Sequence, residues 1–129
     1  MSVSDWIDQQ SQLDTLITAV ANAATIGLDT EFVRISTFHP KPGLIQIAVD
    51  RDAFLIDPQA DLDLKALGHA LTGTTVSILH AAQEDYEVLF RLTGSIPSPV
   101  FDTQVAYALL NDKISLSLSG LVAEVLGKE

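Results

Sequence analysis

Two carboxylates stand one residue apart in a stretch that otherwise has the composition of a core strand: Asp29 and Glu31 in IGLDTEF, residues 26–32. Successive side chains of a strand point to opposite faces. Asp29 and Glu31 therefore share one face, while Thr30 and Phe32 share the other. Adjacent carboxylates raise each other's pKa, and a hard divalent cation such as Mg²⁺ or Mn²⁺ removes that conflict. A hydrated strand end is the alternative interpretation, because Asp-x-Glu is a common sequence.

A second acidic group follows a buried strand. In ILHAAQEDYEVL, residues 78–89, the strand runs into a helix and Asp85 falls in the first helical turn. Free N–H groups and the helix dipole favour a negative charge there, and α/β sheets gather their sites where strands are followed by helices. Simple stabilisation of the helix start by Glu84 or Asp85 is the alternative. His80, at the end of the strand, is by itself interpreted as a structural hydrogen-bonding residue.

The remaining polar residues have mostly structural interpretations. Asp102, in VFDTQ, is expected to cap the helix that follows it. Asp57 precedes a proline after a strand and is expected to form a turn. Arg34, His39 and Lys41 form a small basic group just after the Asp-x-Glu strand. That group could meet phosphates, although the chain has few other cations.

Hydrophobic periodicity and the positions of glycine and proline predict the elements that must position these residues. The first strands are joined by short links, which indicates an antiparallel meander; helices and strands then alternate, which is typical of parallel strands with crossover helices. These elements together predict one α/β domain with a mixed sheet. Helices are expected at 10–24, 62–73, 83–94, 103–112 and 118–126, strands at 25–35, 44–50, 53–58, 75–81 and near 100, and a loop at 36–44.

Composition limits the class of protein. The chain has 129 residues, no cysteine and a formal charge of −10, from 17 acidic and 7 basic side chains. No apolar stretch is long enough to suggest a membrane span, and the first residues lack the pattern of a signal peptide, so a cytoplasmic protein is expected. The acidity argues against a nucleic-acid binder, unless carboxylates hold cations and the basic surface lies elsewhere.

Several stretches, in order, resemble the catalytic domain of the ribonuclease D family of 3′–5′ exonucleases. They are IGLDTEFVRISTFHPKPGLIQIA, IDP, LHAAQEDYEVL and FDTQVAYALL. The resemblance covers nearly the whole chain and implies a ribonuclease H-like fold. It also implies a metal-dependent exoribonuclease that removes nucleotides from RNA 3′ ends, as in tRNA maturation. Asp29 and Glu31 match the family's first motif, and Asp85 matches the second.

The same resemblance implies two divalent ions, Mg²⁺ or Mn²⁺, held by Asp29, Glu31, Asp85 and the terminal phosphate of the RNA. One ion would activate a water and the other would stabilise the departing oxygen. The residues expected to shape the pocket of the terminal nucleotide are Thr30, Phe32, His80 and Gln83.

The family's third motif, a tyrosine four residues before an aspartate, is not matched: Tyr86 is followed by Phe90 and Tyr107 by Asn111. We therefore expect residues 1–129 to form an exonuclease domain that is incomplete at its C-terminal end, with weak or no activity. An exposed apolar face would favour homo-oligomers. The alternatives are a non-catalytic ribonuclease H-like module for nucleic-acid binding or assembly, and an unrelated α/β domain.

Overall fold

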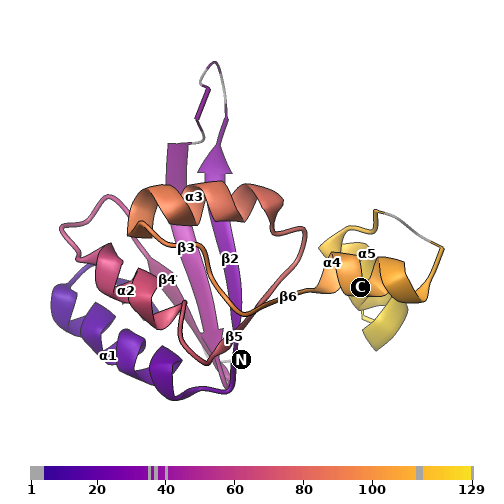
Figure 1. The fold of residues 1–129 in the computed structure, drawn as a ribbon, viewed down its shortest axis with the longest axis horizontal. Coiled ribbons are helices and arrows are strands. Elements are labelled where there is room, and N and C mark those ends of the chain that lie inside the picture. Colours follow the sequence, from indigo (N-terminus) through magenta and orange to yellow (C-terminus); the bar gives the residue numbers. More distant parts are fainter. Residues whose placement is uncertain (1–4, 35, 37, 40, 113–114, 129) are drawn as a thin grey trace.

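The computed structural model describes residues 5–34, 36, 38–39, 41–112 and 115–128. Helices and strands alternate along most of this chain (Figure 1). No helix in the described ranges is long and apolar enough to cross a membrane. The elements are β1 (Asp5–Ile7), α1 (Gln10–Asn22), β2 (Thr25–Val33), β3 (Lys41–Val49), β4 (Asp52–Ile56), α2 (Leu64–Ala70), β5 (Val76–Leu79), α3 (Gln83–Thr93), β6 (Val100–Asp102), α4 (Thr103–Leu110) and α5 (Leu118–Leu126).

A single mixed sheet organises the fold, with the strand order β1-β4-β3-β2-β5-β6. β3 is antiparallel to both of its neighbours, and the other neighbouring strands pair in parallel. The expected meander of β2, β3 and β4 and the parallel strands after it are confirmed. The edge strand β1 was not predicted, because its three residues are too few to show a period.

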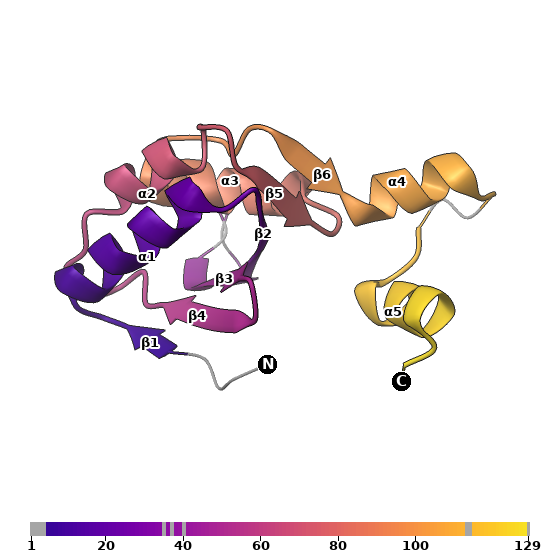
Figure 2. The ribbon, with the colours of Figure 1, turned by 90° about the horizontal axis from the view of Figure 1, so that it is seen from below.

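Three helices, α1, α2 and α3, cover one face of the sheet (Figures 1 and 2). The face of β2 beneath them carries Ile26, Leu28 and Thr30, all at most 5% exposed, whereas Asp29 and Glu31 are exposed on the other face. The alternation inferred from IGLDTEF is therefore confirmed from Ile26 to Glu31, after which the register with β3 shifts. The core below the helices is built from aliphatic side chains of every layer, among them Leu13, Leu16, Val20, Ile45, Ile47, Leu67, Val88 and Leu89.

The expected loop at 36–44 was too long, because β3 begins at Lys41. Residues 35, 37 and 40 lie outside the described residues. Pro42, which indicated a loop, is accommodated within the strand where the β2–β3 register shifts between Glu31 and Phe32. Proline is tolerated in sheets at such irregularities, where its missing N–H breaks no ladder bond. The β2–β3 pair therefore reaches further from the sheet centre than the sequence indicated.

Helices α4 and α5 stand apart from the three helices on the sheet (Figure 2). Neither contains a buried residue, and the side chains of Leu109 and Leu110 are more than four-fifths exposed. The two helices contact each other through a hydrogen bond from the Tyr107 hydroxyl to Glu124. α5 ends, as predicted, at Gly127, which has the positive φ of 63° that suits glycine.

The close contact between α2 and α3 gives a test of the packing. A Cβ at Gly68 would lie 2.8 Å from Thr93 Cβ and 2.9 Å from the Thr93 carbonyl oxygen. We expect Gly68→Ala to lower the free energy of unfolding by about 1–3 kcal/mol in urea titrations, because overpacking outweighs the better helix propensity of alanine. Gly73→Ala is the matched control, since its Cβ would meet only Ala70 O at 3.5 Å. Equal stability of both variants would contradict this packing.

Candidate active site

β2 projects beyond the end of β5, and this projection creates the candidate site. The two strands pair only from Thr25 to Gly27 of β2. Further along, the buried N–H of Thr30 needs another acceptor, and Asp85 Oδ1 accepts from it at 3.2 Å. The Thr30 hydroxyl donates to the same oxygen at 2.5 Å. The carboxylate of Asp85, at the start of α3, is thereby fixed against the strand that carries Asp29.

Asp29 and Asp85 line one open cavity of about 470 Å³. Thr30 and Phe32 from β2 and Gln83 from α3 line it as well, so three of the four residues expected to shape a nucleotide pocket do face this space. The rest of the lining comes from the β5–α3 junction, the first turn of α3, the end of β6 and the start of α4: Ala81, Ala82, Glu84, Asp102, Gln104 and Val105.

Asp102 ties the β5–α3 junction to the start of α4. Its carboxylate accepts the backbone N–H groups of Gln104 and Val105, which confirms the predicted helix cap. It also accepts the N–H groups of Ala81 and Ala82 at 3.0 and 2.9 Å. Ala81 has a φ of +56°, which is unusual for a residue other than glycine, so Asp102 secures a turn that the local sequence does not favour.

Burial and hydrogen bonding act in opposite directions on the carboxyl groups of Asp85, which is buried, and Asp102, which is half-buried. Burial raises the pKa of Asp85; the Thr30 hydrogen bonds only partly offset this, and the negative charges of Asp29 and Glu84 add to it. Burial would also raise the pKa of Asp102, but its four backbone N–H donors outweigh that effect and lower it. Asp102 is thus a stably ionised structural anchor, whereas no positively charged partner of Asp85 is found in the part of the chain that the structure describes.

Glu31 is placed differently from the other two predicted catalytic residues. It is exposed on the same face of β2 as Asp29, but it does not line the cavity. Its carboxylate accepts a long hydrogen bond of 3.4 Å from Gln46 Nε2. Within the described ranges, no three histidine or carboxylate side chains lie close enough together to hold a metal ion. The structure therefore brings Asp29 and Asp85 together and leaves Glu31 nearby on the strand.

His80 lies outside the cavity lining, unlike the other residues expected to contact the nucleotide. Its Nδ1 is 2.8 Å from the Thr103 hydroxyl, and its Nε2 is 2.7 Å from the Leu116 carbonyl oxygen. Both ring nitrogens are therefore engaged within the chain, as the structural interpretation of this histidine predicted. His80 links the end of β5 to the start of α4 and to the segment before α5.

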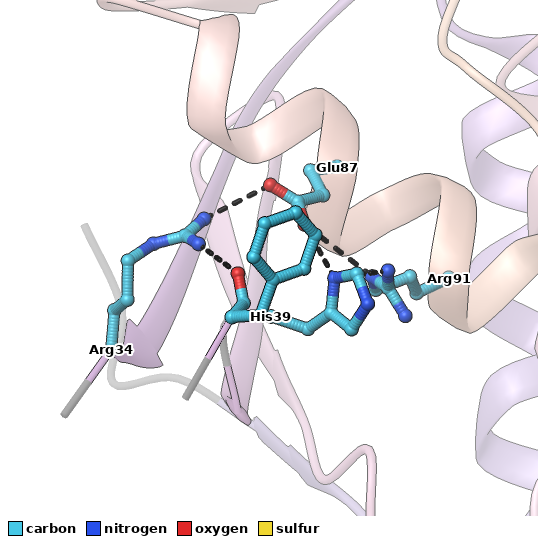
Figure 3. A network of polar contacts seen from close by, with 5 residues as sticks. Arg34, His39, Glu87 and Arg91 are labelled. Atoms are coloured by element: carbon cyan, nitrogen blue, oxygen red, sulfur yellow. Dashed lines mark hydrogen bonds and ion pairs between the residues drawn. The ribbon is translucent and has the colours of Figure 1, made fainter. Parts of the chain in front are cut away.

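A polar network lies further along α3 and the β2–β3 end (Figure 3). Glu87 accepts from Arg34 Nη2 at 2.9 Å, and its carboxylate lies 3.3 Å from His39 Nδ1 and 3.5 Å from Arg91 Nε. Arg91 also contacts His39. The hydrogen bonds from Arg34 and then His39 lower the pKa of Glu87. The sequence indicated the basic group of Arg34 and His39, but not that both contact the Glu87 carboxylate, because Glu87 is far from them in sequence.

Comparison with known proteins identifies the family. A model of the 3′–5′ exonuclease family matches residues 4–129. The chain belongs to the 3′–5′ exonuclease family. Among individual relatives, ribonuclease D of Pseudomonas paraeruginosa is 42% identical over 94% of this chain and 32% of its own length. Ribonuclease D of Escherichia coli is 36% identical over the same shares of the two chains. The chain thus spans about a third of the length of these relatives.

Solved structures agree with this assignment. The crystal structure of Escherichia coli RNase D, described as an exoribonuclease involved in structured RNA processing, superposes with a TM-score of 0.91 at 34% identity. It covers 98% of this chain, which covers 34% of that protein. Trypanosoma brucei RNase D in complex with RNA U12 has a TM-score of 0.83 over 97% of this chain and 47% of its own, at 20% identity, and shows the shared fold. The expected ribonuclease H-like mixed sheet and the similarity to ribonuclease D are both confirmed.

The donor set suits a hard divalent cation. Asp29 and Asp85 offer carboxylate oxygens to one cavity, and the burial of Asp85 beside the charge of Asp29 is a conflict that a cation relieves. Mg²⁺ is commonly held by one or two carboxylates, with waters and substrate phosphates completing its shell. Two carboxylates on an open cavity, with Glu31 next along the strand, are compatible with that mode of binding.

The raised pKa of Asp85 predicts a pH-dependent effect of its replacement. A folded-state pKa above the ordinary aspartate value means that the folded protein keeps the proton longer, so stability falls as the pH rises through that interval. Asparagine can accept the same Thr30 bonds without ionising. We therefore expect Asp85→Asn to melt at a higher temperature than the parent at neutral pH in metal-free buffer. The gain should disappear as the pH falls below the ordinary pKa of aspartate.

The matched control for that measurement is Asp61→Asn, which removes an exposed carboxylate before α2. It should leave the melting temperature nearly unchanged across the same pH range. A lower melting temperature for Asp85→Asn at neutral pH would show that the ionised carboxylate stabilises the fold.

Proposed function

We propose that this chain contributes the divalent-metal site of a 3′–5′ exoribonuclease, which removes nucleotides from RNA 3′ ends. The observation that carries the proposal is the convergence of Asp29 and Asp85 on one open cavity in a chain of the 3′–5′ exonuclease family. The catalytic and metal-binding residues proposed are Asp29, Glu31 and Asp85, the same three that match the family's motifs.

The roles of the chain's own residues follow from their placement. Asp29 and Asp85 would hold metal at the cavity, with Glu31 available from the exposed face of β2. When bound, a pair of Mg²⁺ or Mn²⁺ ions supplies an activated water and positive charge for the phosphate and the leaving oxygen. Thr30 fixes the position of Asp85 through two hydrogen bonds. Phe32 and Gln83 line the space in which the terminal nucleotide would sit.

The substrate class proposed is RNA with a free 3′ end, of the kind processed during tRNA maturation. This choice is supported by the relatives named ribonuclease D and by the Escherichia coli protein, which is described as acting in structured RNA processing. The fold alone does not distinguish RNA from DNA.

A second candidate function is a non-catalytic module of the same fold that binds nucleic acid or supports assembly. One observation favours it: Glu31 does not line the cavity that Asp29 and Asp85 share. The two candidates differ in whether Asp29 and Asp85 bind metal together and whether RNA is shortened.

Metal binding gives the first test. We expect Mn²⁺ titrated calorimetrically into the protein to bind, and Asp29→Asn to abolish or greatly weaken that binding, because a carboxylate ligand is removed. The control is Asp50→Asn in the β3–β4 turn, where a φ of 54° suits asparagine and the side chain is exposed. Equal Mn²⁺ binding by all three proteins would contradict a metal site that includes Asp29.

The same proteins would then be incubated with a 3′-labelled RNA and Mn²⁺. We expect slow release of label from the 129-residue chain and none from Asp29→Asn, since catalytic groups that act as a unit lose orders of magnitude in rate when one is absent. Metal binding without any release of label would favour the non-catalytic module.

Self-association is the expected consequence of the apolar side chains on α4 and α5. Leu109 and Leu110 are 82% and 83% exposed, and Leu126 is 62% exposed. Contiguous exposed apolar residues promote contacts between molecules. We expect sedimentation velocity to show concentration-dependent dimers that Leu109→Gln with Leu110→Gln reduces, whereas Val33→Gln, at an exposed position on β2, does not. A monomer at all concentrations would contradict this expectation.

A further inference from the structure

Three cations of this acidic chain lie in one region. Of its seven arginines and lysines, Arg34, Lys41 and Arg91 lie at the β2–β3 end and on the adjoining part of α3. With a net charge of −10, most of the surface repels a polyanion. RNA affinity is dominated by contacts between phosphates and basic side chains, so this end of the molecule is where a strand can approach.

The polar network of Figure 3 and the cavity lining share two segments of the chain, the end of β2 and α3. Phe32 of β2 lines the cavity, and Arg34 follows two residues later, just after the end of the strand. On α3, Glu84 lines the cavity, while Glu87 and Arg91 follow at helical spacing on the same side. Glu84 and Arg91 are about 10 Å apart along the helix axis, at 1.5 Å per residue. A strand whose last nucleotide enters the cavity would therefore pass this network.

An exposed aromatic ring completes the arrangement. The Phe38 side chain is 86% exposed, and its ring meets the His39 ring edge to face at 4.7 Å. The Phe38 carbonyl oxygen accepts from Arg34 Nη1 at 2.6 Å, so the Phe38 backbone is held next to the guanidinium group. Aromatic side chains next to basic ones are the usual binding elements for single-stranded nucleic acid.

We propose that Arg34, Arg91 and Phe38 form a binding site for single-stranded RNA beside the cavity, in which the guanidinium groups pair with a phosphodiester and Phe38 stacks on a base. This inference rests on the proposed function for the direction of the strand. In the RNA-free chain the Glu87 carboxylate occupies the position of the phosphate and keeps Arg34 and Arg91 oriented.

Exchange of Glu87 for a phosphate is energetically accessible. The side chains of Arg34, Glu87 and Arg91 are each 36–41% exposed, and ion pairs with that much solvent contact are weak. A phosphodiester can therefore take over the guanidinium groups without disrupting the core. Glu87 then competes with the RNA for the two guanidinium groups. Removing its charge should therefore tighten RNA binding if the network binds RNA, but not if the network is purely structural.

The test is fluorescence anisotropy with a labelled single-stranded oligoribonucleotide in EDTA, so that neither metal binding nor cleavage contributes. We expect Arg34→Ala with Arg91→Ala to weaken binding at least tenfold. The slope of log K against log salt should also become shallower, by about 0.7 for each phosphate that no longer meets a guanidinium group. Phe38→Ala should weaken binding about fivefold or more, and Phe38→Trp should retain it. Glu87→Gln should tighten binding.

The charge-matched control is Arg51→Ala with Lys65→Ala, which removes two exposed cations that lie in the β3–β4 turn and at the start of α2. An equal loss of affinity in the control and the Arg34/Arg91 variant would overturn the site, and so would weaker binding by Glu87→Gln, no effect of Phe38→Ala, or no RNA binding by the unaltered chain. Failure of the proposed function would appear in a separate measurement, as equal Mn²⁺ binding by the unaltered chain and by Asp29→Asn.

Discussion

The hydrogen bonds between Thr30 and Asp85 are the interaction on which the candidate site depends. Thr30 lies on the buried face of β2, between the two exposed carboxylates, and its N–H points past the end of β5. A carboxylate taken out of water needs donors to compensate for lost hydration, and Thr30 supplies two from one residue. β2 and α3, which carry the acidic residues, are thus held together at a buried position, where an ionised group is costly.

Asp102 is also a carboxylate partly removed from water, but its pKa is lowered, whereas that of Asp85 is raised. Four backbone N–H groups from two separate junctions converge on its carboxylate and keep it ionised. Asp85 has fewer donors, lies deeper and faces the charge of Asp29, which raises its pKa. One carboxylate is therefore saturated by the protein, while the other still has capacity for an external cation. The number of hydrogen-bond donors therefore distinguishes the two carboxylates more clearly than burial does.

Local patterns predicted much of this arrangement. The alternation around Asp29, the helix start at Gln83 and the glycine stops at Gly94 and Gly127 were readable because each depends on neighbours in sequence. The strand character of Pro42 was not, because it depends on the register of the partner strand. The second pair of Asp102 bonds and the position of Glu31 outside the cavity also depend on tertiary placement. Whether Asp29, Glu31 and Asp85 act in catalysis remains a prediction.

The projection of β2 beyond β5 has a further consequence for the solution behaviour of the protein. A strand with an unpaired edge is a template on which a strand from another molecule can add, and this is a common route to aggregation. Here the N–H of Thr30 is already taken by a side chain of the same molecule, and the negative charge of that side chain discourages a foreign carbonyl from approaching. Asp85, through its bond to Thr30, thus also protects this edge of the sheet against intermolecular β-pairing.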